Sequence, residues 1–324
     1  MSTMARLAGG LLWTWAGVVI IVVALRWVDL TGPVPAIQAL SPVVGLSLLL
    51  VVPSALLLHR KRLAAVAGAS LVAMGLMAAP LFLGSSRDYE DADLVVMVAN
   101  LQFGRGSLAD VEAAVEELGV TTLVLVEVTP DLEADLDDSV LSERLPFRSG
   151  RSQSGPAGTM VLTRDPHRPL TDQPHLSFDQ VSVEVDGPTG PWTILAVHPL
   201  PPLLTDSTQW RADLDELTGW RARQPAGPLV LAGDFNASAA HPGFRDLIDG
   251  MTDAHRAVGA GWVRTWPNGG VFGSGFVQID HVVGRGVTPV DAGTVTVADT
   301  DHVAVWARLR IPSPASAEPP AGSG

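Results

Sequence analysis

The hydrophobic positions divide the chain into an apolar N-terminal part and a mixed C-terminal part. Three N-terminal stretches carry no charged side chain, and they cover residues 7–25, 30–58 and 63–86. Each is long enough to cross a bilayer, which takes about 20 apolar residues in a helix. The pattern therefore predicts a membrane anchor over residues 1–86, with transmembrane helices at about 7–27, 35–58 and 63–84.

The first stretch has an alternative interpretation as a cleavable secretory signal, because Arg6 precedes it and small residues follow near Ala36. The apolar region of such a signal is typically about 7–15 residues long. The stretch here is longer and two more follow it, so we favour an anchor of three helices.

From Leu94 onward, short apolar runs alternate with polar stretches, which is typical of an α/β domain. We expect strands at Leu94–Leu101, Thr122–Val128, Thr159–Thr163, Val181–Val185, Thr193–Val197, Leu229–Ala232, Val277–Val283 and Val303–Leu309. Ser107 is a predicted helix N-cap, and Thr208–Arg221 is a second predicted helix. The domain covers residues 87–311, and the Pro, Ala, Ser and Gly content of residues 312–324 predicts a disordered tail.

The composition of the chain supports the division into an apolar anchor and a polar, acidic domain. The chain of 324 residues is 47% hydrophobic and 17% charged, which argues against a wholly soluble protein. It has no cysteine, and this excludes a thiol nucleophile, a thiolate metal site and a disulfide framework. Residues 87–324 hold 16 basic and 33 acidic side chains without a lysine, a net charge of −17. Such an acidic surface disfavours a protein that wraps nucleic acid.

The basic residues of the anchor predict its orientation. Arg6 and the turn at 60–62 (Arg-Lys-Arg) lie on the same side of the membrane after two crossings. The positive-inside rule places that side in the cytoplasm. The third helix then leads outward into the acidic segment 87–93, so we expect a multi-pass protein of the cell membrane, with the bilayer as partner and an extracytoplasmic α/β domain.

Polar residues gather where the predicted strands end. They are Asn100, Glu127, His198, Asp234, Asn236, Asp280, Asp301 and His302. Each of these residues alone is common in a turn. Because several predicted strand ends carry such polar residues, we expect them to form one shared site. Carboxylate and amide oxygens without thiolates suit a hard divalent cation such as Mg²⁺, and histidines beside it can move protons near neutral pH. The combination predicts phosphoester chemistry, whereas His281 alternates away from Asp280 and is expected to pack.

These residues stand in motifs that resemble those of the endonuclease/exonuclease/phosphatase superfamily, also called DNase I-like. The motifs, in family order, are Val98-Ala99-Asn100-Leu101, Leu125-Val126-Glu127, Val197-His198-Pro199-Leu200, Gly233-Asp234-Phe235-Asn236, Gln278-Ile279-Asp280-His281 and Thr300-Asp301-His302. Weaker matches are Gly158–Arg164 and Thr265-Trp266-Pro267. The resemblance implies a four-layer α/β/β/α sandwich with two mixed sheets face to face and the site at one end.

The resemblance also implies a metal site. Glu127 resembles the main metal-binding carboxylate, and Asn100 and Asp301 resemble residues that help to hold the metal, Mg²⁺ or Mn²⁺, or its waters. The only tyrosine of the chain is Tyr89, near the predicted membrane exit. The tyrosine that abasic-site endonucleases of the superfamily use therefore has no counterpart here.

The remaining site residues resemble the catalytic groups of the superfamily. Asp234 and Asn236 resemble the pair that positions and deprotonates the attacking water. His302 resembles the histidine that contacts the scissile phosphate, oriented by Asp280. His198 resembles the second histidine of the DNase-like branch.

The predicted anchor bears on the substrate, because it holds the site near lipid headgroups. The arrangement resembles actinobacterial membrane-bound members linked to teicoplanin resistance, which implies hydrolysis of undecaprenyl pyrophosphate or a related lipid phosphate. An extracytoplasmic nuclease is the alternative, and it needs an arginine track. Candidates for it are Arg105, Arg148, Arg151, Arg164 and Arg264, which are otherwise ordinary surface residues. A third hypothesis is an inactive, membrane-tethered binding module.

Overall fold

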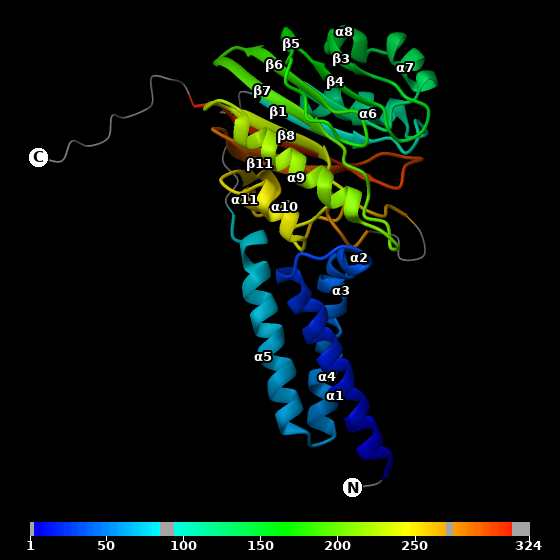
Figure 1. The fold of residues 1–324 in the computed structure, drawn as a ribbon, viewed down its shortest axis with the longest axis vertical. Coiled ribbons are helices and arrows are strands. Elements are labelled where there is room, and N and C mark those ends of the chain that lie inside the picture. The colour runs from blue at the N-terminus through cyan, green and yellow to red at the C-terminus, as the bar shows by residue number, and fades with distance from the viewer. Residues whose placement is uncertain (1–2, 85–93, 270–274, 313–324) are drawn as a thin grey trace, which may run out of the picture.

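A computed structural model describes residues 3–84, 94–269 and 275–312 of the chain. It places an α/β domain on a stalk of N-terminal helices (Figure 1). The predicted exit segment 87–93 lies outside the described residues, as does the predicted disordered tail apart from Pro312. The division between anchor and domain follows the change in hydrophobic pattern.

The stalk contains two helices that are long and apolar enough to cross a membrane. They are α1 (Thr3–Ala24), continued by η1 (Leu25–Trp27), and α5 (Lys61–Ala78), continued by η2 (Ala79–Leu81). Between them the predicted helix over 35–58 is divided into α2 (Val34–Ala39), α3 (Ser41–Leu46) and α4 (Leu48–Leu57). Pro42 has no N–H to bond the preceding turn, and Ser47 bonds back to Val44 through Oγ and N–H, so the helix is interrupted at both places. The prediction of three continuous transmembrane helices is therefore not confirmed.

The α/β domain contains two six-stranded sheets. The first has the order β11 (Thr288–Thr296), β12 (Val303–Arg310), β1 (Leu94–Asn100), β2 (Thr122–Val126), β4 (Thr159–Thr163) and β3 (Phe147–Arg151). The second has the order β5 (His167–Pro169), β6 (Val181–Gly187), β7 (Gly190–Val197), β8 (Leu229–Asp234), β10 (Asp280–Arg285) and β9 (Thr252–Asp253). The pairs β1/β2 and β7/β8 are parallel and the other pairs are antiparallel, so both sheets are mixed.

Helices cover the outer faces of both sheets. On the first sheet they are α6 (Leu108–Leu118), α7 (Pro130–Asp137) and α8 (Leu141–Arg144), and on the second α9 (Thr208–Arg223) and α10 (Pro242–Leu247). A short helix, α11 (Ala254–Val258), packs beside β11 and β10. The four layers are visible in Figure 1, and they confirm the predicted α/β/β/α sandwich.

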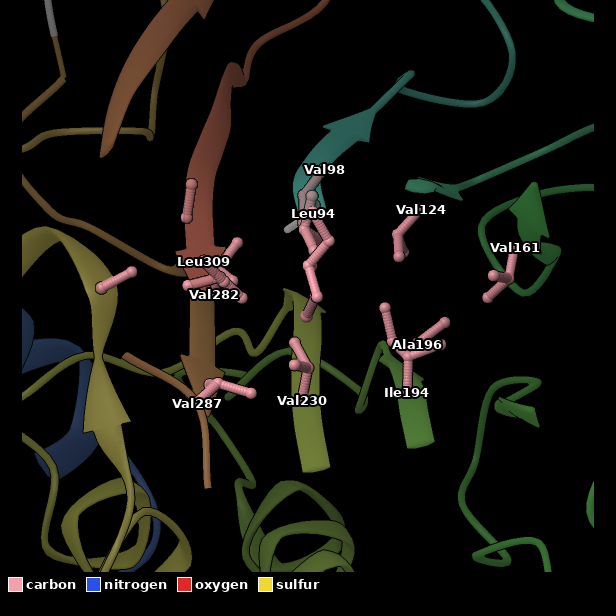
Figure 2. Packing of buried hydrophobic residues seen from close by; sticks show 14 of the residues in the cluster. Leu94, Val98, Val124, Val161, Ile194, Ala196, Val230, Val282, Val287 and Leu309 are labelled. Carbon is pink, nitrogen blue, oxygen red and sulfur yellow. The ribbon is translucent and has the colours of Figure 1, made fainter. Parts of the chain in front are cut away.

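The main core lies between the two sheets, where their inward rows of side chains meet (Figure 2). Side chains alternate between the faces of a strand. On β1 the residues 94, 96 and 98 face this core, while 95, 97 and 99 pack under the helices of the first sheet. Every residue of β1 is buried, which explains its continuous apolar run.

The same alternation carries polar residues to one end of this core. Asn100 follows the inward row of β1, Asp234 follows that of β8, and His198 follows that of β7. Asp280 precedes the inward Val282 on β10. All four side chains are buried. The end of the apolar core is thus lined by ionisable and amide groups.

Several element boundaries differ from the predictions. β2 ends two residues early because Glu127 adopts φ +60°, and β10 begins at Asp280 because Val277 instead forms a bridge with Trp266. The strands β3, β5, β9 and β11 were not predicted. They are short or carry alternating polar residues at the edges of the sheets, where no continuous apolar run marks them.

Hydrogen bonds join the anchor to the α/β domain. They link Arg211 Nε to Asp29 Oδ2 (2.8 Å), Ser207 Oγ to the Gly32 carbonyl (3.1 Å), His241 Nε2 to the Pro35 carbonyl (2.9 Å) and the Gly261 N–H to the Leu81 carbonyl (2.8 Å). The first two reach the segment between η1 and α2, the third reaches Pro35 in α2, and the last reaches the end of η2. Both long helices of the anchor are therefore tied to the domain at their upper ends.

We expect Gly233→Ala to lower the free energy of unfolding by roughly 2–4 kcal/mol. Gly233 has φ +155°, and a Cβ there would lie 2.0 Å from the carbonyl oxygen of Val197 on the neighbouring strand. The matched control is Gly219→Ala in α9, where the nearest atom is 3.5 Å away. It should gain up to about 1 kcal/mol from helix propensity. Urea denaturation of both variants tests this, and equal stabilities would contradict it.

Candidate active site

The side chain of Asn100 lies at the centre of the candidate site and joins two carboxylates. Its Nδ2 donates hydrogen bonds to Glu127 Oε1 and to Asp234 Oδ2, each at 3.1 Å. Its Oδ1 accepts the backbone N–H of Gln102 at 2.9 Å, which fixes the orientation of the amide. Glu127 follows β2 and Asp234 ends β8, so this one side chain connects the two sheets.

Asp234 is a buried carboxyl group between the sheets. Burial, and after it the charge of Asp280, raises the pKa of Asp234 to about 7. The two aspartates face each other in the register of β8 and β10. Asp234 Oδ1 accepts the N–H of Asn236 at 2.8 Å, and Asn236 Nδ2 donates to the Pro199 carbonyl at 3.0 Å. A carboxyl group with this pKa can take up a proton near neutral pH.

His302 lies between the two aspartates. Its Nδ1 donates to Asp280 Oδ2 at 2.9 Å, and its Nε2 is 3.7 Å from Asp234 Oδ2. Although burial lowers it, the charges of Asp280 and Asp234 raise the pKa of His302 to about 10. The ring is therefore an imidazolium at neutral pH and supplies positive charge within an acidic site.

His198 is a neutral neighbour of the same carboxyl group. Its side chain is buried, and its Nε2 is 3.9 Å from Asp234 Oδ2. The ring packs on Phe178, with 4.9 Å between centroids, and Gln180 bonds both the N–H and the carbonyl of His198. Burial, and after it the charge of His302, lowers the pKa of His198 to about 3. At neutral pH this imidazole holds no positive charge.

The sequence profile of the endonuclease/exonuclease/phosphatase family matches residues 97–302, nearly the whole α/β domain. The chain belongs to this family. Two structures of TDP2 from D. rerio have the same fold, each with a TM-score of 0.54 over 67% of this chain and 98% of the other. One, in complex with a single-strand DNA product, is 16% identical, and the other, humanized by 14 mutations, is 14% identical.

A further structural neighbour is an endonuclease/exonuclease/phosphatase from Beutenbergia cavernae. It is 18% identical, with a TM-score of 0.48 over 68% of this chain and 72% of the other. No curated protein matches the sequence of the chain. At 14% and 16% identity the two TDP2 structures show the fold alone, and they leave the substrate and the activity of this chain open.

Members of the family are metal-dependent hydrolases, and the residues around Glu127 fit a divalent cation. Burial raises the pKa of Glu127 in spite of hydrogen bonds from Asn100 and the Phe103 N–H, and the charge of Asp301 raises it further. Asp301 Oδ2 accepts the Trp266 Nε1–H at 3.1 Å. Two nearby carboxylates beside an amide form an oxygen donor set that suits Mg²⁺.

A second group of candidate metal ligands contains Asp234, Asp280 and His302, whose ligand atoms all lie within 4.8 Å of one another. Both nitrogens of the His302 ring face a carboxylate, Nδ1 toward Asp280 at 2.9 Å and Nε2 toward Asp234 at 3.7 Å. In this arrangement the ring pairs with the two aspartates and turns neither nitrogen toward a separate ligand position. We therefore interpret this group as a buried ion-pair network and place the candidate metal site at Glu127.

Two threonines that hold the site were not assigned a role from the sequence. Thr265 Oγ1 accepts the backbone N–H of Asp280 at 3.2 Å. Thr300 Oγ1 donates to the Asn100 carbonyl at 2.8 Å and accepts the N–H of His302 at 3.2 Å. Both threonines stand within the motifs. The sequence pattern does not distinguish a threonine whose hydroxyl bonds to the backbone from one that is exposed to solvent. They fix the backbone from which the ionisable groups project.

His281 occupies the face of β10 opposite to Asp280, as alternation predicts. Its Nδ1 is hydrogen-bonded to Asp253 Oδ2 at 2.8 Å and its Nε2 to the Ala237 carbonyl at 3.1 Å. The ring packs against Phe244. These contacts confirm that His281 packs beneath the site and does not line it.

The folded chain should lose stability as the pH rises from 7 to 10. The pKa of His302 is about 10 in the folded state and about 6.5 in an unfolded chain, so its stabilising contribution is present below pH 6.5 and is lost as the pH rises through 10. Asp234 completes its titration near the lower limit of this window. Few other side chains titrate between pH 7 and 10, since the chain has no cysteine, one tyrosine and one lysine.

The test is urea denaturation at several pH values between 7 and 10, for the unmodified chain and for Asp280→Asn. The substitution removes the largest charge that raises the pKa of His302. We expect the variant to show a weaker dependence of unfolding free energy on pH in this window. An equal dependence in both proteins would contradict the ion-pair network.

Proposed function

We propose that the protein is a membrane-anchored, metal-dependent phosphoesterase with an extracytoplasmic active site, which hydrolyses a polyprenyl pyrophosphate or a related lipid phosphate. The observation that carries the proposal is the place of the site relative to the anchor. Pro199, whose carbonyl accepts from Asn236 of the site, begins the loop that ends at Ser207, and Ser207 bonds to Gly32 of the anchor. The site thus lies close to the plane where the apolar helices end.

The anchor is proposed to cross the membrane three times. α1 runs toward the domain, α3 and α4 return together, and α5 runs toward the domain again (Figure 1). They pack on one another through small and aliphatic residues, while Leu11, Leu50, Leu57 and Leu76 are between 71% and 81% exposed. Such a surface is costly in water and suits hydrocarbon. The interrupted segment Ser41–Leu57 supplies the second crossing.

The residues of the site can carry out hydrolysis of a terminal phosphate. Asp234 accepts a proton from water, which is held beside Asn236, and the oxygen attacks the terminal phosphorus. The bond from that phosphorus to the bridging oxygen breaks, giving inorganic phosphate and the lipid monophosphate. The His302 imidazolium binds the anionic phosphate oxygens, and Asp280 holds its ring in place. Glu127, assisted by Asn100 and Asp301, would hold Mg²⁺ or Mn²⁺, which offsets phosphate charge when bound.

The state of His198 favours a pyrophosphate over a nucleic-acid substrate. A nuclease must protonate a poorly stabilised sugar alkoxide, for which general acid catalysis contributes about 10²–10⁴-fold. His198 is buried and its pKa is lowered to about 3, so it is not a general acid at neutral pH, and the imidazolium of the site, His302, is paired with Asp280. A phosphate leaving group departs without such help.

The contacts of the five candidate arginines also disfavour a nuclease. Arg148, Arg151 and Arg164 pair with acidic side chains and are ordinary surface residues. Arg105 lies over the Phe103 ring and Arg264 over the Trp262 ring. Of the five candidates for an arginine track, these two alone form no ion pair among the described residues. A strand of nucleic acid needs a longer run of cations.

We expect the purified full chain to release phosphate from undecaprenyl pyrophosphate with Mg²⁺, to lose this activity in EDTA and to leave plasmid DNA intact. Asp234→Asn should lower kcat by about 10²–10⁴-fold because it removes the general base. The matched control is Asp186→Asn, an exposed residue near the end of β6, which should keep full activity. Full activity in chelator would remove Glu127 from its role, and cleavage of DNA without lipid hydrolysis would favour the nuclease.

The orientation has its own test. Alkaline phosphatase is active only outside the cytoplasm, so a fusion after Ile311 should be active and a fluorescent cytoplasmic reporter at the same place should be dark. Three crossings from a cytoplasmic Arg6 require this result. The reverse pattern would overturn the proposed topology while leaving the chemistry of the site untouched.

A further inference from the structure

The loop between β7 and α9 exposes two leucines beside the site. Leu203 is 53% exposed and Leu204 is 68% exposed. In the described part of the α/β domain, the large hydrophobic side chains that are exposed number five: Phe103, Val140, Phe147, Leu203 and Leu204. Leu203 and Leu204 are adjacent on one loop and form an exposed apolar surface, and the core of the domain does not bury them.

The beginning of this loop is part of the site. His198 immediately precedes it, and the Pro199 carbonyl accepts the Asn236 side chain at 3.0 Å. The next residue, Leu200, donates its N–H to the buried Asp213 of α9 at 3.0 Å. The loop therefore starts from a fixed position beside Asp234, and its leucines follow within six residues of His198.

The end of the loop is fixed to the anchor. Ser207 is buried and its Oγ donates to the Gly32 carbonyl at 3.1 Å. One helical turn further on, Arg211 pairs with Asp29 at 2.7 Å. In Figure 1 the yellow-green chain before α9 runs down toward α2 at the top of the stalk. The exposed leucines therefore bridge the distance between the site and the anchor.

The apolar surface continues onto the anchor itself. Trp27 is 64% exposed, Val28 41% and Leu30 50%, and they stand within five residues of Gly32. Below them the outward faces of α1 and α5 are apolar. Exposed apolar side chains therefore stand on both segments that the hydrogen bond from Ser207 to Gly32 joins, the turn above the stalk and the loop that begins after His198.

We propose that Leu203 and Leu204 bind the hydrocarbon chain of the lipid substrate where it leaves the bilayer, and so select long-chain over short-chain pyrophosphates. This inference rests on the proposed function. The occupant is a hydrocarbon chain attached to the phosphate, because the surface connects the phosphate-binding end of the domain with the apolar stalk. When a lipid chain covers the two leucines, their apolar surface is removed from water, and this favours binding of the long substrate.

The test compares two pyrophosphates that have the same head and different chains. Undecaprenyl pyrophosphate is long enough to contact the loop while its phosphates are in the site, and isopentenyl pyrophosphate is water-soluble and too short. For the double variant Leu203→Gln and Leu204→Gln in the full chain, we expect kcat/KM for the long substrate to fall about tenfold or more through a higher KM. The value for the short substrate should not change.

Two controls separate this effect from others. Val140→Gln replaces an apolar residue that is 49% exposed on the far side of the first sheet, and it should leave both substrates unaffected. The double variant with methionine at both positions keeps an apolar surface and should retain the preference for the long chain. Because both leucines are exposed, the glutamine variant should fold, which thermal unfolding checks.

The outcomes distinguish this inference from the proposed function. If the unmodified chain hydrolyses the long pyrophosphate and the glutamine variant does so equally well, the loop does not bind the chain and the proposed function stands. If the variant loses both substrates equally, the loop shapes the phosphate site and the inference is wrong. If the unmodified chain hydrolyses neither pyrophosphate, the proposed function itself fails.

Discussion

The alternation of side chains along four central strands is the constraint on which the site depends. The inward rows that build the apolar core between the sheets end, on β1, β7, β8 and β10, in Asn100, His198, Asp234 and Asp280. These groups are buried because the rows are buried, and a buried carboxylate is unfavourable without a partner. The hydrogen bonds of Asn100 and the charge of His302 supply those partners. A shift of one residue in the register of any of these strands would remove its polar group from the site.

Burial and close spacing together explain the unusual protonation states. Asp234 stands opposite Asp280 on the adjacent strand, and burial, followed by the charge of Asp280, raises the pKa of Asp234. The charges of the two aspartates raise the pKa of His302 against the effect of burial, whereas burial, followed by the charge of His302, lowers the pKa of His198. The ends of β7, β8, β10 and β12 therefore bring together a carboxyl that exchanges a proton near neutral pH, an imidazolium and a neutral imidazole. Side chains of the same type therefore differ in protonation state because their surroundings differ.

Much of the fold and most of the candidate site could be predicted from the sequence, for a physical reason. Strands buried on both faces appear as continuous apolar runs, and polar residues at their ends stand out, as at Asn100, Asp234 and Asp280. Edge strands such as β3 have no such run. Thr265 and Thr300 act through backbone hydrogen bonds that need the folded chain to exist. The ties from Ser207 and His241 to the anchor join residues about 200 positions apart, beyond the reach of any local pattern.

The charge of the site limits what can bind there. Glu127, Asp234, Asp280 and Asp301 provide four carboxyl groups, and the His302 imidazolium interacts with all four. A pyrophosphate brings further negative charge, so its approach is unfavourable until a divalent cation offsets it. The overall charge of −17 beyond residue 86 adds to this repulsion for a long polyanion, which meets the whole surface. The lipid pyrophosphate that we propose as substrate would bring its charge to the site alone, and its hydrocarbon chain would meet the exposed apolar residues beside the anchor. The same electrostatics that disfavour nucleic acid are therefore compatible with a substrate that carries its charge at one end.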